Sequence, residues 1–259
     1  MHLDRDKEAR LTSPKIVLCA TQRCGSTMVI EDMRNTGKLG NPEEWFVPWD
    51  PEKTDIDWNA QLDGVFNRAT GETGIVAIKV MANQLAKVDR CLSGQPEPTE
   101  SFEYFYRIFA DAVWVKISRR DVIYQAISRL MARQTGINHA TKEQNDEHFA
   151  GNLLKGYDPK YNDRTKYKYD AILYEINSIT LENLAWTAFF EQYGIKPFNL
   201  VYEEFSADPN MIHLDVMAEA IGLSKIDKKQ RKMVKVGNSK NKEWHQQFLS
   251  DVSAKNFRA

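Results

Sequence analysis

The sequence contains little cysteine, no long apolar run and no excess of either charge. Its three cysteines, Cys19, Cys24 and Cys91, are spaced neither like a zinc site nor like a disulfide framework, and their odd number favours a reducing compartment. No run approaches the roughly 20 apolar residues that span a bilayer, and the charged stretch MHLDRDKEARLTSPK is unlike a signal peptide. Lys and Arg number 35 against 36 Asp and Glu, which argues against a nucleic-acid binder with a basic surface.

The length of 259 residues is enough for one large domain with a sizeable core. We therefore expect a single domain over residues 1–259, in which residues 1–14 form a loosely ordered N-terminal extension. With no apolar span and no signal segment, the expected protein is soluble and cytoplasmic, and any anion site in it must be a local cluster.

Short apolar runs alternate with helical patterns along the chain. The runs at 16–20, 75–81, 112–118 and 198–202 predict strands. Helices are predicted at 26–35 before Gly37, at 121–134, at 180–193 with Thr180 as its cap, and from Asp208-Pro209 to Gly222. This alternation predicts an α/β fold with a mainly parallel central sheet flanked by helices. The polar stretches 49–73 and 139–169 are expected to be excursions over the active-site face or surface insertions.

The stretch KIVLCATQRCGSTMVIEDMRNTG, residues 15–37, places a small polar loop between a strand and a helix. The first N–H groups of a helix lack partners within the helix, and the helix dipole adds partial positive charge there. Gly25 lets the backbone come close to a ligand, Ser26 and Thr27 add hydroxyl donors, and Arg23 adds a full charge. The loop therefore predicts an anion site, the alternative being an ordinary strand-to-helix turn.

The loop lacks the lysine of a nucleotide triphosphatase, because Gly25 is followed by Ser26. No clear metal-binding aspartate ends an apolar strand. The ligand should therefore carry less charge at its reacting end than a triphosphate and need no metal, and the sulfonate of a phosphosulfate fits this description.

A second cationic element lies in KISRRDVIYQAIS, residues 116–128. A strand is predicted to end at Arg119-Arg120, and Ser128 follows about two turns into the next helix. Two arginines can clamp a phosphate bidentately, and the serine hydroxyl can donate to the same group. Alternatively, both arginines are surface charges that pair with Asp121 and its neighbours.

Together these segments resemble the trehalose 2-sulfotransferase-type family, bacterial carbohydrate sulfotransferases that use 3′-phosphoadenosine 5′-phosphosulfate. The resemblance runs from Ile16 to Trp244 and rests on ATQRCGSTMVIEDMRNTGKLGNPEEWF and ISRRDVIYQAISRLMARQTG as a pair. Weaker support comes from IVAIKVMANQ, LENLAWTAFFEQYGIKPFNLVYEEF and NSKNKEW. It implies a P-loop-like sulfotransferase fold, adenosine 3′,5′-bisphosphate as product, and a homodimer.

The resemblance also implies roles for individual residues. The loop after the first strand would hold the 5′-phosphosulfate, through Gln22, Arg23, Cys24, Gly25, Ser26 and Thr27. Either Arg119 or Arg120, with Ser128, would hold the 3′-phosphate, and Lys235 and Lys240 would close over the nucleotide. The catalytic base would be Glu44 in the stretch Gly40–Phe46, with Glu43 beside it as the alternative and a pair of solvated carboxylates as the other.

The predicted reaction is in-line transfer of the sulfuryl group to a hydroxyl of a carbohydrate or glycoconjugate, with a trehalose-like acceptor possible. Arg23 would stabilise charge, and Lys79 would either neutralise the sulfonate or reach water from its apolar strand. Aromatic rings at Trp45, Phe46 and Trp49 could stack on a sugar, and Asn83 and Gln84 could bind its hydroxyls. The rival functions are a P-loop kinase that uses ATP and a non-catalytic nucleotide-binding protein.

Overall fold

The computed structural model describes residues 12–256, so most of the expected N-terminal extension lies outside the described residues. Its centre is a sheet of four parallel strands in the order β2-β1-β3-β6. The strands are β1 (Lys15–Ala20), β2 (Val76–Met81), β3 (Val113–Ser118) and β6 (Phe198–Val201). The α/β fold, the parallel sheet and all four sequence-predicted strands are confirmed.

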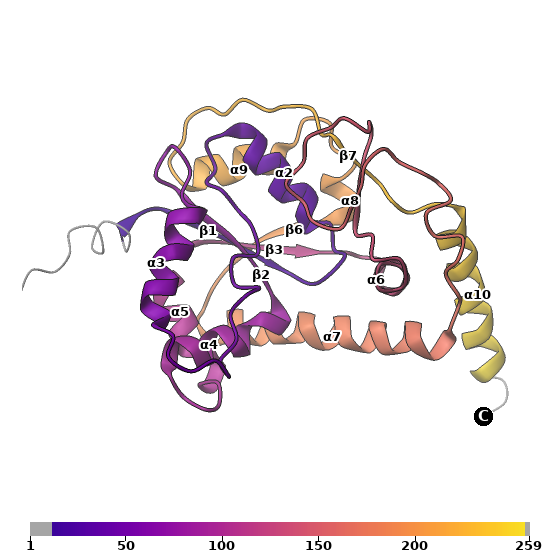
Figure 1. The fold of residues 1–259 in the computed structure, drawn as a ribbon, viewed down its shortest axis with the longest axis horizontal. Coiled ribbons are helices and arrows are strands. Elements are labelled where there is room, and N and C mark those ends of the chain that lie inside the picture. Colours follow the sequence, from indigo (N-terminus) through magenta and orange to yellow (C-terminus); the bar gives the residue numbers. More distant parts are fainter. Residues whose placement is uncertain (1–11, 257–259) are drawn as a thin grey trace, which may run out of the picture.

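Helices cover both faces of the sheet, and β1 is therefore buried on both sides. Ile16 and Leu18 contribute to a core with α2 (Ser26–Thr36) and α9 (Ile212–Ala220). Val17 and Cys19 contribute to an aromatic-rich core on the opposite face. The helices of that second core are α3 (Trp58–Ala69), α4 (Leu85–Ser93), α5 (Glu103–Phe109) and α7 (Tyr169–Gln192) (Figure 1).

A third cluster of apolar side chains joins α7 to α6 (Val122–Thr135) and to the C-terminal helix α10 (Ser239–Asn256). Two short helices, α8 (Tyr202–Phe205) and η1 (Ala82–Gln84), follow β6 and β2, and η2 (Glu100–Phe102) precedes α5. A small second sheet contains β5 (Leu153–Leu154), β4 (His139–Thr141) and β7 (Met233–Val234) in that order. None of the helices between residues 12 and 256 has the length and hydropathy of a transmembrane span.

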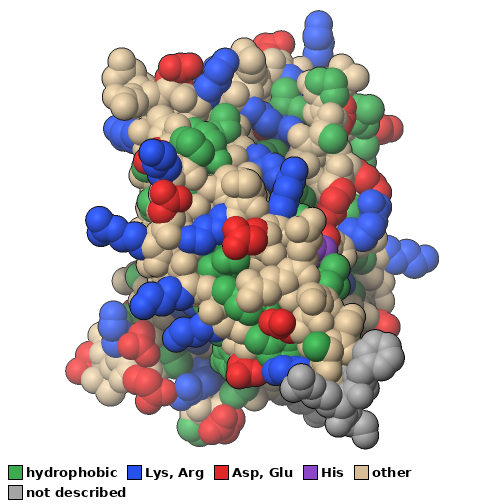
Figure 2. Space-filling view, turned by 90° about the vertical axis from the view of Figure 1, so that its right-hand side faces the viewer, with side chains coloured by type: hydrophobic (Ala, Val, Ile, Leu, Met, Phe, Trp, Pro, Cys, Tyr) green, Lys and Arg blue, Asp and Glu red, His purple; other side chains and the backbone are tan. Residues whose placement is uncertain are grey.

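The face that carries α10 shows Lys and Arg side chains interspersed with Asp and Glu (Figure 2). The two signs alternate over this side of the molecule, so no single-sign surface covers it.

Two predicted helix starts are wrong. The helix predicted to begin at Thr180 is α7, which begins at Tyr169, and the Thr180 hydroxyl donates to the carbonyl of Ile176 at 2.9 Å inside it. Packing of the first turns against α6 and α10 extends this helix beyond its local cap signal. The helix predicted to open at Asp208-Pro209 is α9, which begins at Ile212, although the Asp208 carboxylate accepts the Ile212 N–H at 2.7 Å.

The polar stretch 49–73 is also more regular than predicted, because it contains α3. Asp57 caps this helix by accepting the N–H groups of Asn59 and Ala60. Only a narrow face of this helix is buried, by Val65, Phe66 and Ala69. So few apolar residues do not produce a clear helical pattern in the sequence.

The strand order places two loops at one edge of the sheet. From β1 the chain passes to β2 on one side, and then returns to β3 on the other side of β1. In open α/β sheets such a switch point leaves a crevice beyond the carboxyl ends of the strands. The loops that follow β1 and β3 therefore flank the same crevice, which brings both cationic elements of the sequence together.

Candidate functional site

A cavity of about 690 Å³ lies at this edge of the sheet. Its walls come from the β1–α2 loop, the loop after β3, helix α6, the start of β4 and residues 233–238. Nine sequence-predicted site residues line it: Gln22, Arg23, Gly25, Ser26, Thr27, Glu44, Arg119, Ser128 and Lys235. Four others do not: Cys24, Lys79, Arg120 and Lys240.

The β1–α2 loop makes a tight turn into helix α2. Arg23 and Gly25 both have positive φ, 67° and 92°, and the Gly25 carbonyl accepts the N–H groups of Met28 and Val29. A Cβ on Gly25 would lie 2.5 Å from the Cδ2 atom of Tyr202. Only glycine combines this backbone conformation with such a close approach to the Tyr202 ring.

Gly25→Ala is therefore expected to destabilise the protein by about 3 kcal/mol, through backbone strain and the clash with Tyr202. The matched control is Gly37→Ala at the other end of α2. Gly37 has φ 68° but no atom within 4 Å of its ideal Cβ, so roughly 1 kcal/mol is expected. Free energies of unfolding from urea titrations measure both, and equal losses would contradict the clash.

A buried glutamine on α6 holds the loop in place. The Gln125 Nε2 atom donates to the Thr21 hydroxyl and to the Gln22 carbonyl, each at 2.8 Å. Gln125 is 1% exposed. The sequence interpretation did not single it out, although a glutamine on the apolar face of a predicted helix is a signal of such a role.

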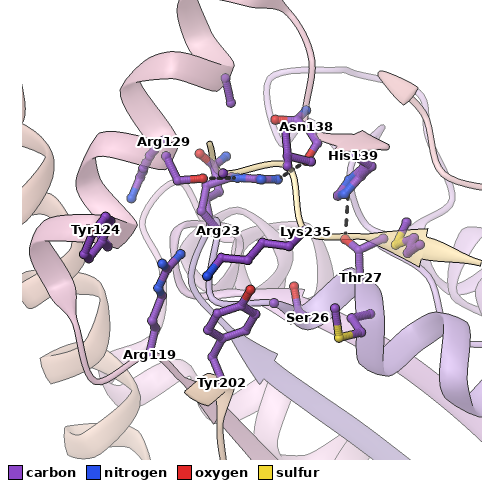
Figure 3. A pocket seen from close by; sticks show the side chains of 18 of the residues that line it. Arg23, Ser26, Thr27, Arg119, Tyr124, Arg129, Asn138, His139, Tyr202 and Lys235 are labelled. Atoms are coloured by element: carbon purple, nitrogen blue, oxygen red, sulfur yellow. Dashed lines mark hydrogen bonds between the residues drawn. The ribbon is translucent and has the colours of Figure 1, made fainter. Parts of the chain in front are cut away.

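Arg23 turns inward from the loop and joins it to two other elements. Its Nε atom donates to the Ser128 hydroxyl at 3.1 Å, and its Nη1 atom donates to the Asn138 carbonyl (Figure 3). Burial, together with the positive charge of Arg119, lowers the pKa of the Arg23 guanidinium. An anion bound in the cavity would stabilise the charge of this buried cation.

Cys24 lies behind the loop and not in the cavity. Its side chain is buried in the core with α2, and burial raises the pKa of its thiol. The Cys24 side chain is therefore not placed to contact a ligand in the cavity, contrary to the prediction. A small inert side chain fits this position.

The two adjacent arginines after β3 diverge. The Arg119 guanidinium lies over the Tyr202 ring, 4.7 Å from its centroid, and faces the cavity (Figure 3). Its Nε atom is buried without a hydrogen bond and lies 3.9 Å from the Glu203 Oε1 atom, so a ligand oxygen could still accept from it. Arg120 is exposed, as the surface-charge alternative predicted for both, but it pairs with Glu204 and not with Asp121.

The two predicted lysines near the C-terminus also diverge. Lys235 extends into the cavity toward Arg119 and Tyr202 (Figure 3). Lys240 lies in the first turn of α10, where its Nζ atom donates to the carbonyls of Asn162 and Asp163 at 3.0 and 2.7 Å. It therefore stabilises the packing of the 139–169 segment and does not reach the cavity.

Glu44 lies at the edge of the cavity in a fixed hydrogen-bond frame. Its Oε1 atom is 2.7 Å from the Nζ atom of Lys79, and its Oε2 atom accepts from Gln84 Nε2 at 3.1 Å. The Gln84 Oε1 atom in turn accepts the Met81 N–H at 3.2 Å. Lys79 thus pairs with Glu44 and does not reach water, while the Glu43 carboxylate accepts the Glu44 N–H.

The predicted aromatic platform for a sugar is wrong for Phe46 and Trp49. These two rings are 0% and 3% exposed and pack edge-to-face in the aromatic-rich core. Their burial outweighs their use as an exposed surface. Trp45 is half-buried, its Nε1 atom donates to the Asn41 carbonyl, and the Arg68 guanidinium lies over its ring.

Comparison with known proteins gives one family and two relatives. The model of the Stf0 sulphotransferase family matches residues 15–251. Over an alignment 282 residues long, the chain is 25% identical to a trehalose 2-sulfotransferase of Mycobacterium tuberculosis. The alignment covers 94% of this chain and 97% of the relative. It is 24% identical over 218 residues to a trehalose 2-sulfotransferase of Mycolicibacterium smegmatis, covering 72% and 76%.

Proposed function

Because the chain belongs to the Stf0 sulphotransferase family, we propose that it transfers the sulfuryl group of 3′-phosphoadenosine 5′-phosphosulfate to a hydroxyl of a carbohydrate. The observation that carries this proposal is the cavity, which gathers the strand-to-helix loop, Arg119, Ser128, Lys235 and Glu44 around one space. The two relatives are both trehalose 2-sulfotransferases by name, which supports a trehalose-like disaccharide or glycoconjugate as acceptor.

The donor's 5′-phosphosulfate would bind at the start of α2. The Ser26 and Thr27 hydroxyls and the first N–H groups of the helix supply donors there, and Arg23 supplies charge. The 3′-phosphate would bind to Arg119 and Ser128, where Arg119 Nε makes no hydrogen bond within the protein. Lys235 would close over the nucleotide from residues 233–238.

Glu44 is the proposed base. As the acceptor oxygen forms its bond to sulfur, the hydroxyl proton passes to the Glu44 carboxylate, and the bond from sulfur to the phosphate oxygen breaks. Adenosine 3′,5′-bisphosphate leaves with that electron pair. Lys79 and Gln84 hold both carboxylate oxygens of Glu44, so the base is oriented before the acceptor arrives.

Adenosine 3′,5′-bisphosphate is expected to raise the melting temperature more than ATP with magnesium does. A ligand at 100 times its Kd adds about 2.7 kcal/mol of stability, which corresponds to several degrees for a chain of this size. Differential scanning fluorimetry measures both shifts. A larger shift with magnesium-ATP would contradict the donor assignment and favour the P-loop kinase.

Transfer itself is tested by incubating the protein with the phosphosulfate and either trehalose or pooled bacterial glycans. Mass spectrometry is expected to show one acceptor that gains a sulfate. Binding of the bisphosphate without any sulfated product would support the non-catalytic alternative.

A further inference from the structure

His139 lies where the β1–α2 loop meets the Glu44–Lys79 pair. It is the first residue of β4 and lines the cavity. Its Nε2 atom is 3.5 Å from the Thr27 hydroxyl oxygen (Figure 3). The preceding residue, Asn138, accepts a hydrogen bond from Arg23, so two contacts hold this segment against the loop.

The backbone around His139 is held from two sides. The Asn152 carbonyl accepts the N–H groups of Asn138 and His139 at 2.9 and 3.4 Å. His139 pairs with Leu153 of β5 in the ladder, and the next residue pairs with Val234 of β7. The imidazole is therefore presented to the cavity by a small sheet and not by a free loop, which suits a residue with a defined contact to make.

The electrostatic surroundings keep this imidazole uncharged. Burial, with the positive charges of Arg23 on the loop and Lys79 on β2 and a smaller effect of His148, lowers the pKa of His139 to about 2. The Glu44 carboxylate lies 2.7 Å from Lys79, and of the two cations Arg23 has the larger effect. At neutral pH the ring has one N–H to donate, and it is too weakly basic to take the proton of a sugar hydroxyl.

We propose that His139 is a further catalytic residue, whose uncharged imidazole donates a hydrogen bond to an oxygen of the sulfonate during transfer. This rests on the proposed function. His139 exchanges no proton in the step: the acceptor proton goes to Glu44, and the electron pair of the broken bond leaves with the bisphosphate. Arg23 already brings a positive charge to this region, and Lys79 is paired with Glu44, so a neutral donor adds a contact to the developing charge without adding another cation.

The contact is tested by NMR of protein labelled with ¹⁵N at histidine. Without an acceptor, the phosphosulfate is expected to shift the His139 ring nitrogens clearly more than adenosine 3′,5′-bisphosphate does, because only the former carries the sulfonate. Equal shifts with both ligands, each bound, would overturn the proposal and leave the donor site standing. Failure of both ligands to bind would remove the donor site, and the His139 proposal with it.

A pair of variants separates this role from a structural one. His139→Leu is expected to lower kcat by roughly 10- to 100-fold, the effect of losing one hydrogen bond to a charged group, with the Kd of the bisphosphate unchanged. His139→Gln can place an amide N–H near the position of Nε2 and is expected to restore most of that loss. A leucine variant as active as the wild type, or a glutamine variant no better than leucine, would overturn the proposal.

Discussion

Glu44→Gln is expected to lower kcat for sulfuryl transfer by about 100- to 10,000-fold, the range measured for loss of a general base. Glutamine keeps the size of the side chain but cannot take the acceptor proton. The Kd of adenosine 3′,5′-bisphosphate is expected to stay unchanged, because Glu44 is proposed to act on the acceptor and not to bind the phosphates. Steady-state kinetics with the phosphosulfate and a sugar acceptor, together with calorimetry of the bisphosphate, measure both quantities.

Two controls make this result interpretable. Glu43→Gln alters the neighbouring carboxylate, which contacts the Glu44 N–H and does not line the cavity, so a small effect is expected. Glu44→Gln also leaves Lys79 buried without its partner, which can cost about 3 to 5 kcal/mol of stability. The double variant Glu44→Gln/Lys79→Met removes that charge, and it should regain stability without regaining activity. Unchanged turnover of folded Glu44→Gln would remove Glu44 from the role of base.

Arg119→Ala is expected to raise the Kd of adenosine 3′,5′-bisphosphate about 100-fold, since it removes one or two charge-assisted hydrogen bonds to a phosphate. Arg119 faces the cavity with an Nε atom that makes no hydrogen bond, and its stacking on Tyr202 fixes the direction of its guanidinium. Isothermal titration calorimetry at constant ionic strength measures the change.

The adjacent Arg120 is the matched control. Arg120→Ala removes an exposed pair with Glu204 and is expected to change neither binding nor stability by more than about 1 kcal/mol. Arg119→Lys keeps the charge but loses the planar fork of donors, so its Kd should lie between those of Arg120→Ala and Arg119→Ala. A loss of affinity in Arg120→Ala that equals or exceeds the loss in Arg119→Ala would place the 3′-phosphate elsewhere.

The local pattern of residues was enough to predict the fold and the general location of the site. Apolar runs such as residues 16–20 favour strands buried on both faces, and glycine at position 25 permits the left-handed backbone before a helix start. These features act over a few residues, so they can be recognised without knowing the rest of the chain. The helix start at Thr180 was wrong because packing against α6 and α10 extends α7 beyond the local signal. The start at Asp208 was wrong because Met211, with φ 47°, interrupts the helical backbone just before Ile212.

The choice between neighbouring candidates depended on tertiary structure. Arg119 and Arg120 are chemically equivalent neighbours, as are Glu43 and Glu44, and only one of each pair lines the cavity. Lys235 and Lys240 were both predicted to close over the nucleotide, and only Lys235 lines the cavity. Adjacent side chains point in different directions. Which of the two side chains faces the cavity depends on the elements that pack against the other side of the backbone.

The sequence by itself determined an α/β sheet and a strand-to-helix corner whose chemistry suits an anion, because burial and helix-start chemistry are local properties of the chain. Only the tertiary structure decided that Lys79 pairs with Glu44, that Gln125 holds the loop, and that His139 lies beside Thr27. Each of these contacts links elements far apart in sequence. Such contacts form only when the switch between β1 and β3 brings those elements to the same edge of the sheet.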